Sequence, residues 1–203
     1  MKKKTAKYIL FLFTFLFVLF AAPQHTEAAS AKTMKKAYTK YMKKVSSKKY
    51  FRIVSIGESK KPVLLIARGQ SQYARMKEYG ETASPYEFMS CDVYYYINGK
   101  VKKIGTFENG TRSLTLTKKS GQYYLTNGLS DAAWFGCVKK NKLYVYEYYK
   151  EWEKSCVRAG GKKIKNLGYI SARTYSKYKS SYKNAGTIKF MKNTGTNRTK
   201  AAK

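Results

Sequence analysis

The amino-acid sequence predicts an α+β fold, mostly an antiparallel β meander or sandwich, with an N-terminal helix and a short C-terminal helix. Three observations support this class. Hydrophobic residues make up 43% and aromatic residues 16% of the 203 residues, which is enough to bury a core. An early segment has apolar residues at helical spacing, and short runs of β-branched and aromatic residues between turn residues follow it. We expect a single β-rich domain over residues 29–192 and a basic, flexible tail over 193–203.

Residues 1–28 have the three parts of a secretory signal peptide. A mostly apolar run from Tyr8 to Ala22 follows a cationic head, and small residues precede the cleavage position after Ala28. The run of ~15 apolar residues is shorter than the ~20 that a membrane-spanning helix requires. We expect cleavage after Ala28, with Ala31 as the alternative position, and secretion of the protein. The exported chain would carry 38 basic and 10 acidic residues, a formal charge of +28.

The first element expected in the domain is a helix over residues 31–48. Its apolar side chains recur at the spacing of one helix face and lysines occupy the other face; the apolar positions are Met34, Ala37, Tyr38, Tyr41, Met42 and Val45. We expect this face to pack on the core. A basic amphipathic helix can alternatively lie on an anionic membrane, but this face contains no Trp or Leu.

Two strands are expected next, over residues 51–56 and 63–67. The second is a continuous apolar run, which indicates burial on both faces. Residues 69–90 contain Gly69, Gly80 and Pro85 and have no clear period. We therefore expect a long, irregular and mobile connection there.

The strongest local signal is a hairpin that joins residues 91–97 to 100–104. Its turn is Asn98-Gly99, a pair that favours the two positive φ angles of a type I′ turn. Turn residues separate the later strands, at Asn109-Gly110, Ser120-Gly121, Asn127-Gly128 and Asn141. Those strands are expected at 113–117, 122–126, 134–138 and 143–149. A short helix over 171–182 and a last strand over 187–191 complete the expected domain.

The expected exported chain contains no histidine, because His25, the only one, lies in the leader. Ser-His and Cys-His nucleophiles and the usual zinc ligand sets are therefore excluded. Glycine-rich phosphate loops are absent from the sequence, and its S-x-x-K matches are as frequent as chance predicts. We find no catalytic constellation, and we expect no enzyme activity, cofactor or metal.

One catalytic alternative is a carboxylate-dependent glycan hydrolase. Glu147, Glu151 and Glu153 would share one face if their strand continued, which would bring paired carboxylates together. Lys150 and Lys154 lie beside these glutamates in the sequence. Simple ion pairing is therefore the plainer interpretation.

Three cysteines follow the leader, at Cys91, Cys137 and Cys156. Export permits disulfides, but an odd number leaves at least one thiol outside an intramolecular pair. We prefer a disulfide between Cys137 and Cys156, because a hairpin between them would bring them together, and buried thiols are the alternative. No C-x-x-C pair indicates a metal site.

The chain has 20 tyrosines, and two groups of them alternate along expected strands. Each group should project from one face of a sheet. Exposed rings would stack on sugars or bases while neighbouring lysines attract phosphate, whereas buried or half-buried rings are ordinary strand residues. The candidate polyanion or glycan site comprises Tyr94, Tyr96, Tyr144, Tyr146, Tyr148 and Lys142.

Lysine carries most of the positive charge, with 35 Lys against seven Arg. Lysine is a hydrated point charge that attracts phosphates without reading a base sequence. We therefore expect a secreted, cationic binding or structural protein of the cell envelope, associated with polyanions such as wall teichoic acid, anionic lipid or nucleic acid. The alternatives are a membrane-active cationic factor and a solvated basic surface without a dedicated ligand. The sequence leaves the oligomeric state open.

Four segments carry a resemblance to a known group of proteins. They are KAYTKYMKK, YFRIVSIGESKKPVLLIA, CDVYYYINGKVKKIGTF and TIKFMKNTGTNR, the last ending with Asn193, Thr194, Asn197 and Arg198. In these segments the chain resembles a large group of poorly characterised secreted proteins of clostridia-type Gram-positive bacteria. The resemblance implies an extracytoplasmic β-rich domain and supplies no catalytic residues.

Many proteins of that group carry an acidic stretch between the first two strands that is suggestive of calcium binding. Residues 55–64 match this stretch here, and they contain one acid, Glu58, and two lysines. Calcium requires several hard oxygen ligands. The comparison with the group therefore implies that the calcium site is lost in this chain.

Overall fold

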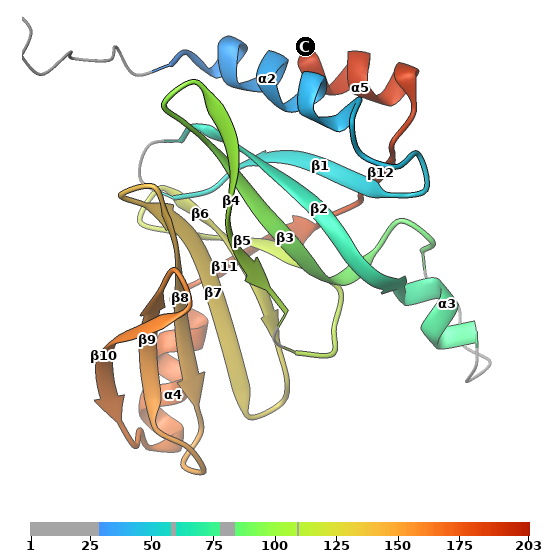
Figure 1. Cartoon of the computed structure of the whole chain (residues 1–203). Coiled ribbons are helices and arrows are strands. Elements are labelled where there is room, and N and C mark those ends of the chain that lie inside the picture. Colours follow the sequence, from blue (N-terminus) through green and yellow to red (C-terminus); the bar gives the residue numbers. More distant parts are fainter. Residues whose placement is uncertain (1–28, 58–59, 78–83, 109) are drawn as a thin grey trace, which may run out of the picture.

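The computed structural model describes residues 29–57, 60–77, 84–108 and 110–203. Two antiparallel β-sheets face each other, and helices pack against their outer faces (Figure 1). The prediction of an α+β fold, mostly antiparallel β, with an N-terminal helix and a short C-terminal helix is confirmed. The expected signal peptide, residues 1–28, lies outside the described residues.

The smaller sheet, sheet A, has the strand order β12-β1-β2-β3-β4. The turn of the predicted hairpin is present, with φ angles of 49° at Asn98 and 77° at Gly99. Residues 62–67 are buried throughout, as the continuous apolar run predicted. The strands are β1 (Tyr50–Ser55), β2 (Pro62–Ser71), β3 (Phe88–Ile97), β4 (Lys100–Phe107) and β12 (Met191–Lys192).

The larger sheet, sheet B, has the strand order β10-β9-β8-β7-β6-β5-β11. Its first six strands follow one another as a meander, and the chain then returns so that β11 pairs with β5 at the far edge. The edge strand β10 carries exposed lysines, which discourage pairing with another chain. The strands are β5 (Thr115–Lys119), β6 (Gln122–Gly128), β7 (Ala132–Lys139), β8 (Lys142–Tyr149), β9 (Ser155–Ala159), β10 (Lys162–Gly168) and β11 (Lys183–Thr187).

The space between the two sheets holds the main hydrophobic core, which includes Phe107, Leu114 and Leu125. Glycine allows the sheets to approach closely. A Cβ atom at Gly136 would lie 2.9 Å from the ring of Phe107, and a Cβ atom at Gly57 would collide with the backbone of Val138. Gly57 also has a φ of 92°, a conformation that favours glycine.

Helix α2 (Ala31–Met42) covers the outer face of sheet A. It begins at Ser30, whose hydroxyl oxygen accepts a hydrogen bond from the Thr33 N–H group at 3.1 Å. Three residues of the predicted apolar face are fully buried, Met34, Tyr38 and Met42. The helix ends six residues earlier than the apolar period predicted. Among the described residues, no helix is long and apolar enough to span a membrane.

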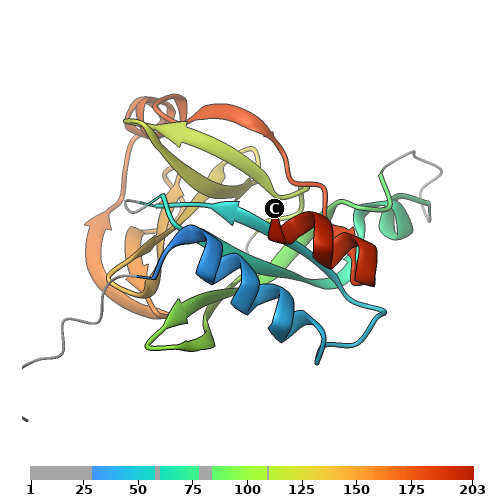
Figure 2. The same ribbon diagram turned by 90° about the horizontal axis from the view of Figure 1, so that it is seen from above.

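The C-terminal residues form helix α5 (Gly195–Ala202), which lies beside α2 (Figure 2). Residues 193–203 were expected to form a flexible tail, and the structure places eight of them in this helix. The buried amide of Asn193 ties the two helices together, since its oxygen accepts a hydrogen bond from Arg198 at 3.0 Å. Its nitrogen donates at 2.8–3.2 Å to the carbonyl oxygens at the end of α2, those of Met42, Val45 and Ser46.

Helix α4 (Ala172–Ser180) corresponds to the short helix expected over 171–182, and it packs on the outer face of sheet B. Helix α3 (Gln72–Lys77) occupies part of the connection that was expected to be irregular over 69–90. Residues 78–83 of that connection lie outside the described residues.

Three local predictions in the sheets were wrong. Asn127-Gly128 is not a turn, because Asn127 lies buried in β6 and its side chain nitrogen donates to the Met89 carbonyl oxygen at 2.8 Å. The strands β9 and β10 were not expected. The exposed segment that forms β10, KKIKNLG, has no alternating apolar pattern. The last expected strand, 187–191, is replaced by the separate strands β11 and β12.

Candidate functional site

The first predicted tyrosine pair lies on the outer face of sheet A. Tyr94 and Tyr96 are half-buried beneath α2, on the face of β3 opposite the inter-sheet core. The Tyr94 ring centroid is 5.3 Å from that of Tyr41, and the Tyr96 N–H group donates to the Tyr38 hydroxyl oxygen at 3.1 Å. These rings hold the helix on the sheet.

The second tyrosine group lies on the outer face of sheet B, so the two groups do not form one site. Tyr148 is buried and its ring stacks on that of Tyr178 from α4, with centroids 4.7 Å apart. Tyr144 and Tyr146 are half-buried, and Tyr146 packs edge-on against Tyr124. Lys142 is exposed at the start of β8.

The three glutamates of the hydrolase alternative do not share a strand face, because β8 ends at Tyr149. Glu147 is buried and forms an ion pair with Arg158, whose Nε lies 2.9 Å from a carboxylate oxygen. Glu151 and Glu153 are exposed beyond the strand, and Glu151 accepts a hydrogen bond from the Ala172 N–H group. Ion pairing is confirmed for Glu147, although its partner is not a neighbouring lysine.

The predicted disulfide between Cys137 and Cys156 is not formed, and all three cysteines are buried thiols. Cys137 lies opposite Tyr144 on one side of β8, and Cys156 lies opposite Glu147 on the other side. The two cysteines are therefore separated by a whole strand and by three positions along it. Strands lie ~4.8 Å apart, so the separation exceeds the ~7 Å that a disulfide permits between Cα atoms.

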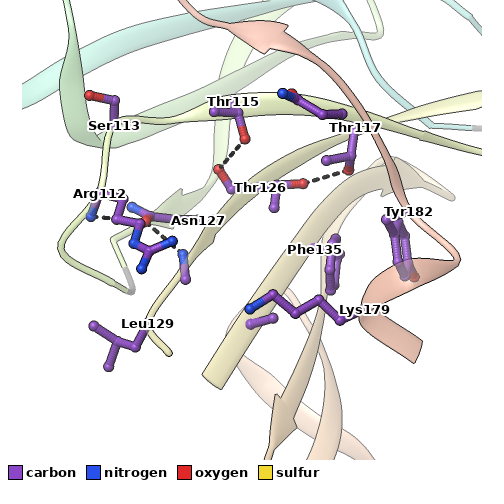
Figure 3. Close-up of a pocket in the computed structure, with 13 residues that line it drawn as sticks. Arg112, Ser113, Thr115, Thr117, Thr126, Asn127, Leu129, Phe135, Lys179 and Tyr182 are labelled. Atoms are coloured by element: carbon purple, nitrogen blue, oxygen red, sulfur yellow. Dashed lines mark hydrogen bonds between the residues drawn. The ribbon is translucent and has the colours of Figure 1, made fainter. Parts of the chain in front are cut away.

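A pocket of about 320 Å³ opens on the outer face of sheet B, beyond the end of α4 (Figure 3). We call it the threonine pocket, because three threonine side chains from neighbouring strands form its floor. Thr115 of β5, Thr126 of β6 and Phe135 of β7 lie in one row across the sheet. The lining residues are Arg112, Ser113, Thr115, Thr117, Thr126, Asn127, Gly128, Leu129, Ala133, Phe135, Lys179, Tyr182 and Asn184.

The threonine hydroxyls are ordered by hydrogen bonds. The hydroxyl oxygens of Thr117 and Thr126 are 2.6 Å apart, and either can be the donor. The Thr115 hydroxyl donates to the Thr126 carbonyl oxygen at 3.5 Å. Since only one hydrogen is used between Thr117 and Thr126, the pair retains one hydroxyl hydrogen for a ligand.

An aromatic wall closes the pocket on the side of α4. The rings of Phe135 and Tyr182 are stacked, with centroids 3.6 Å apart and an interplanar angle of 12°. Burial, followed by the neighbouring Tyr148, raises the pKa of Tyr182, so its hydroxyl stays protonated. The Lys119 ammonium lies 4.4 Å from the centroid of the same ring, and burial lowers the pKa of Lys119.

The lining carries two cations and no carboxylate. Arg112, from the loop before β5, and Lys179, from the last turn of α4, extend toward the same space from opposite sides (Figure 3). Glu87 is not part of the lining, and it accepts a hydrogen bond from the hydroxyl of the lining residue Ser113 at 2.8 Å. The pocket therefore offers two positive charges, hydroxyl groups and an aromatic wall, a combination suited to an anionic, hydroxylated ligand.

Sequence reasoning missed this pocket, because its lining is drawn from residues 112 to 184. The alternation of Thr115 and Thr117 along one strand was a usable signal for a polar face. Nothing local indicated that Arg112 and Lys179 would flank it.

Comparisons with protein-family models, with curated proteins and with solved structures found no match for this chain. Among the described residues, no three His, Cys, Asp or Glu side chains cluster as a metal-ligand set.

Proposed function

We propose that the protein is a secreted, cationic binding protein of the cell envelope that associates with phosphate-bearing polymers without catalysing a reaction. The observation that carries this proposal is the threonine pocket, in which Arg112 and Lys179 flank hydroxyl groups and no carboxylate enters the lining. The excess of 31 positive charges in the whole sequence supports it by attracting polyanions over a longer range.

Each part of the pocket has a role in this proposal. Arg112 and Lys179 pair with one phosphate group through charge-assisted hydrogen bonds. The threonine hydroxyls bind polyol or sugar hydroxyls beside the phosphate, and the aromatic wall of Phe135 and Tyr182 borders their carbon skeleton. Wall teichoic acids combine phosphodiesters with polyols, and they are the polymers that fit this description best.

The test measures binding of the full exported chain to purified Gram-positive walls and to walls stripped of teichoic acid, at low and high salt. We expect retention that falls steeply with salt and is lost on stripped walls. Equal retention on both wall preparations would reject the proposed ligand, and equal retention by vesicles of anionic lipid would reassign the protein to membranes.

Two matched double variants distinguish binding in the threonine pocket from attraction by the diffuse positive charge. The double substitution Arg112→Gln and Lys179→Gln removes two charges from the pocket, whereas Lys36→Gln and Lys40→Gln remove two exposed charges from α2. We expect about tenfold or greater weakening for the first pair, since charge-assisted hydrogen bonds contribute about 1.5–3 kcal/mol each. The second pair should weaken binding much less, and equal losses would contradict a dedicated pocket.

A further inference from the structure

A second pocket, of about 380 Å³, lies between β4, β8 and the turn after β9. We call it the arginine pocket, because Arg158 is the cation in its lining. Glu147 and Tyr149 line it from β8, and Glu108 lines it from the end of β4. Its lining residues are Ile104, Gly105, Thr106, Glu108, Leu143, Val145, Glu147, Tyr149, Arg158, Gly160 and Gly161.

Glu147 is the only carboxylate buried among the described residues, and it accepts hydrogen bonds from three side chains. Its carboxylate accepts from Arg158 Nε at 2.9 Å, from the Tyr149 hydroxyl at 3.3 Å and from the Cys156 thiol at 3.1 Å. The Trp134 indole N–H in turn donates to the Tyr149 hydroxyl oxygen at 3.3 Å. The carboxylate is therefore fixed from three directions.

Stability alone does not account for this arrangement. The desolvation cost of a buried ion pair often cancels its Coulomb gain, and apolar residues of similar size often stabilise a fold as well. What the network does achieve is to hold Arg158 in one orientation. Glu147 is also the largest cause that raises the pKa of Arg158, so the guanidinium is permanently charged.

The guanidinium is held by one nitrogen and remains available at the others. The ion pair uses Nε, and no hydrogen bond to another described residue uses the two terminal nitrogens. The side chain of Arg158 is 39% exposed, although that of Glu147 is only 5% exposed. A fixed guanidinium whose terminal N–H groups reach a pocket matches the bidentate geometry of a carboxylate.

Each of the two carboxylates in the lining, Glu108 and Glu147, is paired with an arginine. Glu108 at the rim is paired with Arg68, whose nitrogen lies 3.1 Å from its carboxylate. Lys163 of β10 lies opposite Arg158 in the sheet. Ile104, Leu143 and Val145 form an apolar wall beside these charges, which suits a small aliphatic side chain next to the carboxylate.

We propose that the arginine pocket binds the C-terminal carboxylate of a short peptide that ends in a small apolar residue. Arg158 binds the carboxylate, and Glu147 is a positioning residue that orients Arg158. The apolar wall receives the terminal side chain, and the glycines at 160 and 161 leave the mouth open to the rest of the peptide. This site does not depend on the threonine pocket or on the proposed binding of wall polymers.

The test is a titration of the ¹⁵N-labelled exported chain with N-acetyl-alanyl-alanine, in its L and D forms, followed by NMR. We expect saturable shifts at the Arg158 Nε–H signal and at the amides of Thr106 and Gly161. The matched control is N-acetyl-alanyl-alaninamide, which lacks the carboxylate and should bind at least tenfold more weakly. Equal shifts with the amide, or no shift at Arg158 with millimolar peptide, would overturn the proposal.

Glu147→Gln distinguishes positioning from plain electrostatics by the sign of its effect. Removal of a negative charge beside the pocket should strengthen carboxylate binding if only the net charge matters. If Glu147 is a positioning residue, loss of the ion pair that orients Arg158 should weaken carboxylate binding several-fold. Stronger binding by this variant would therefore reject that role.

Two further variants keep the test decisive if Glu147→Gln does not fold. Arg158→Lys retains the charge but loses the bidentate geometry, so we expect at least tenfold weaker binding. Lys142→Gln removes an exposed charge near Gly160 and should change the affinity less than twofold. Equal effects of these two substitutions would show that only diffuse charge attracts the peptide.

Discussion

The outer faces of the two sheets are covered to different extents. On sheet A, α2 buries three side chains and α5 lies beside it (Figure 2). On sheet B, the nine-residue α4 buries only Tyr175, and it packs over β7 and β8. The neighbouring strands β5 and β6 present threonine hydroxyls instead of apolar side chains, and the threonine pocket lies over them.

This difference shows how a sheet can be stable and still present an open face. Threonine is β-branched, so it favours strands, and its hydroxyl remains solvated or hydrogen-bonded. Tyr94 and Tyr96, in contrast, are large amphipathic rings that a helix covers. The covered face therefore contributes mainly to stability, and the open face is where we place binding.

The largest expected effect lies on the covered face. Tyr38 has 0% relative exposure, and its hydroxyl donates to the Pro62 carbonyl oxygen at 2.9 Å. Tyr38→Ala removes a buried ring and this hydrogen bond, so we expect a loss of about 3–5 kcal/mol in the free energy of unfolding, measured by urea denaturation. Tyr41→Ala, at a half-buried position of the same helix, should cost clearly less. Equal costs would show that α2 does not cover the sheet as described.

A smaller effect is expected where α5 joins α2. Asn193→Ala would remove one hydrogen-bond donor from three carbonyl oxygens at and just after the end of α2. We expect a loss of about 1–3 kcal/mol in the free energy of unfolding and faster amide exchange in α5. Asn197→Ala, at a more exposed position with one hydrogen bond to Lys192, is the matched control and should cost less than Asn193→Ala. A tail that is flexible in solution would make both substitutions neutral.

On the open face, a substitution should change binding more than it changes the stability of the fold. Thr117→Val removes the hydroxyl pair with Thr126 while keeping a β-branched side chain of similar volume. We expect a change of about 1 kcal/mol or less in unfolding, and several-fold weaker binding to teichoic acid in a direct titration. If binding stays unchanged while stability falls, the hydroxyl pair is a structural feature of the sheet only.

The last prediction concerns the inner side of sheet B and depends on pH. Burial, followed by the hydrogen bond to Glu147, raises the pKa of the Cys156 thiol to about 11 from 9.0. A raised pKa means that the folded state favours the neutral thiol. The neutral thiol therefore contributes fully to the free energy of unfolding below pH 9, and this contribution is lost as the pH rises toward 11. We expect the free energy of unfolding to fall less over this range in Cys156→Ala than in the unchanged protein. Parallel pH profiles of the two proteins would contradict this contribution.

The local elements were largely predictable from the sequence. The period of Met34, Tyr38 and Met42 indicated a packed helix, and Asn98-Gly99 indicated the hairpin that the structure contains. Alternation also placed each tyrosine group on one face of a sheet. These predictions succeeded because side-chain periodicity and turn conformation depend on neighbouring residues.

Other features had no local signal. Asn193 was expected to be part of a polar tail, but its side-chain nitrogen donates to residues about 150 positions earlier in the chain. Cys137 and Cys156 were expected to meet, but β8 separates them. Neither the exposed edge strand β10 nor the burial of Glu147 followed from composition or spacing.

The sequence by itself determined the excess of positive charge, the single histidine and the order of most helices and strands. Only the tertiary structure decided which outer face a helix covers, and which residues meet in the two pockets. Arg112 and Lys179 line one pocket because strand pairing and helix packing bring distant segments of the chain together. Glu147 meets Arg158 because β8 and β9 pair in a register that places both side chains on one face of the sheet. Such contacts depend on the register of the whole sheet, and a short window of sequence carries no information on that register.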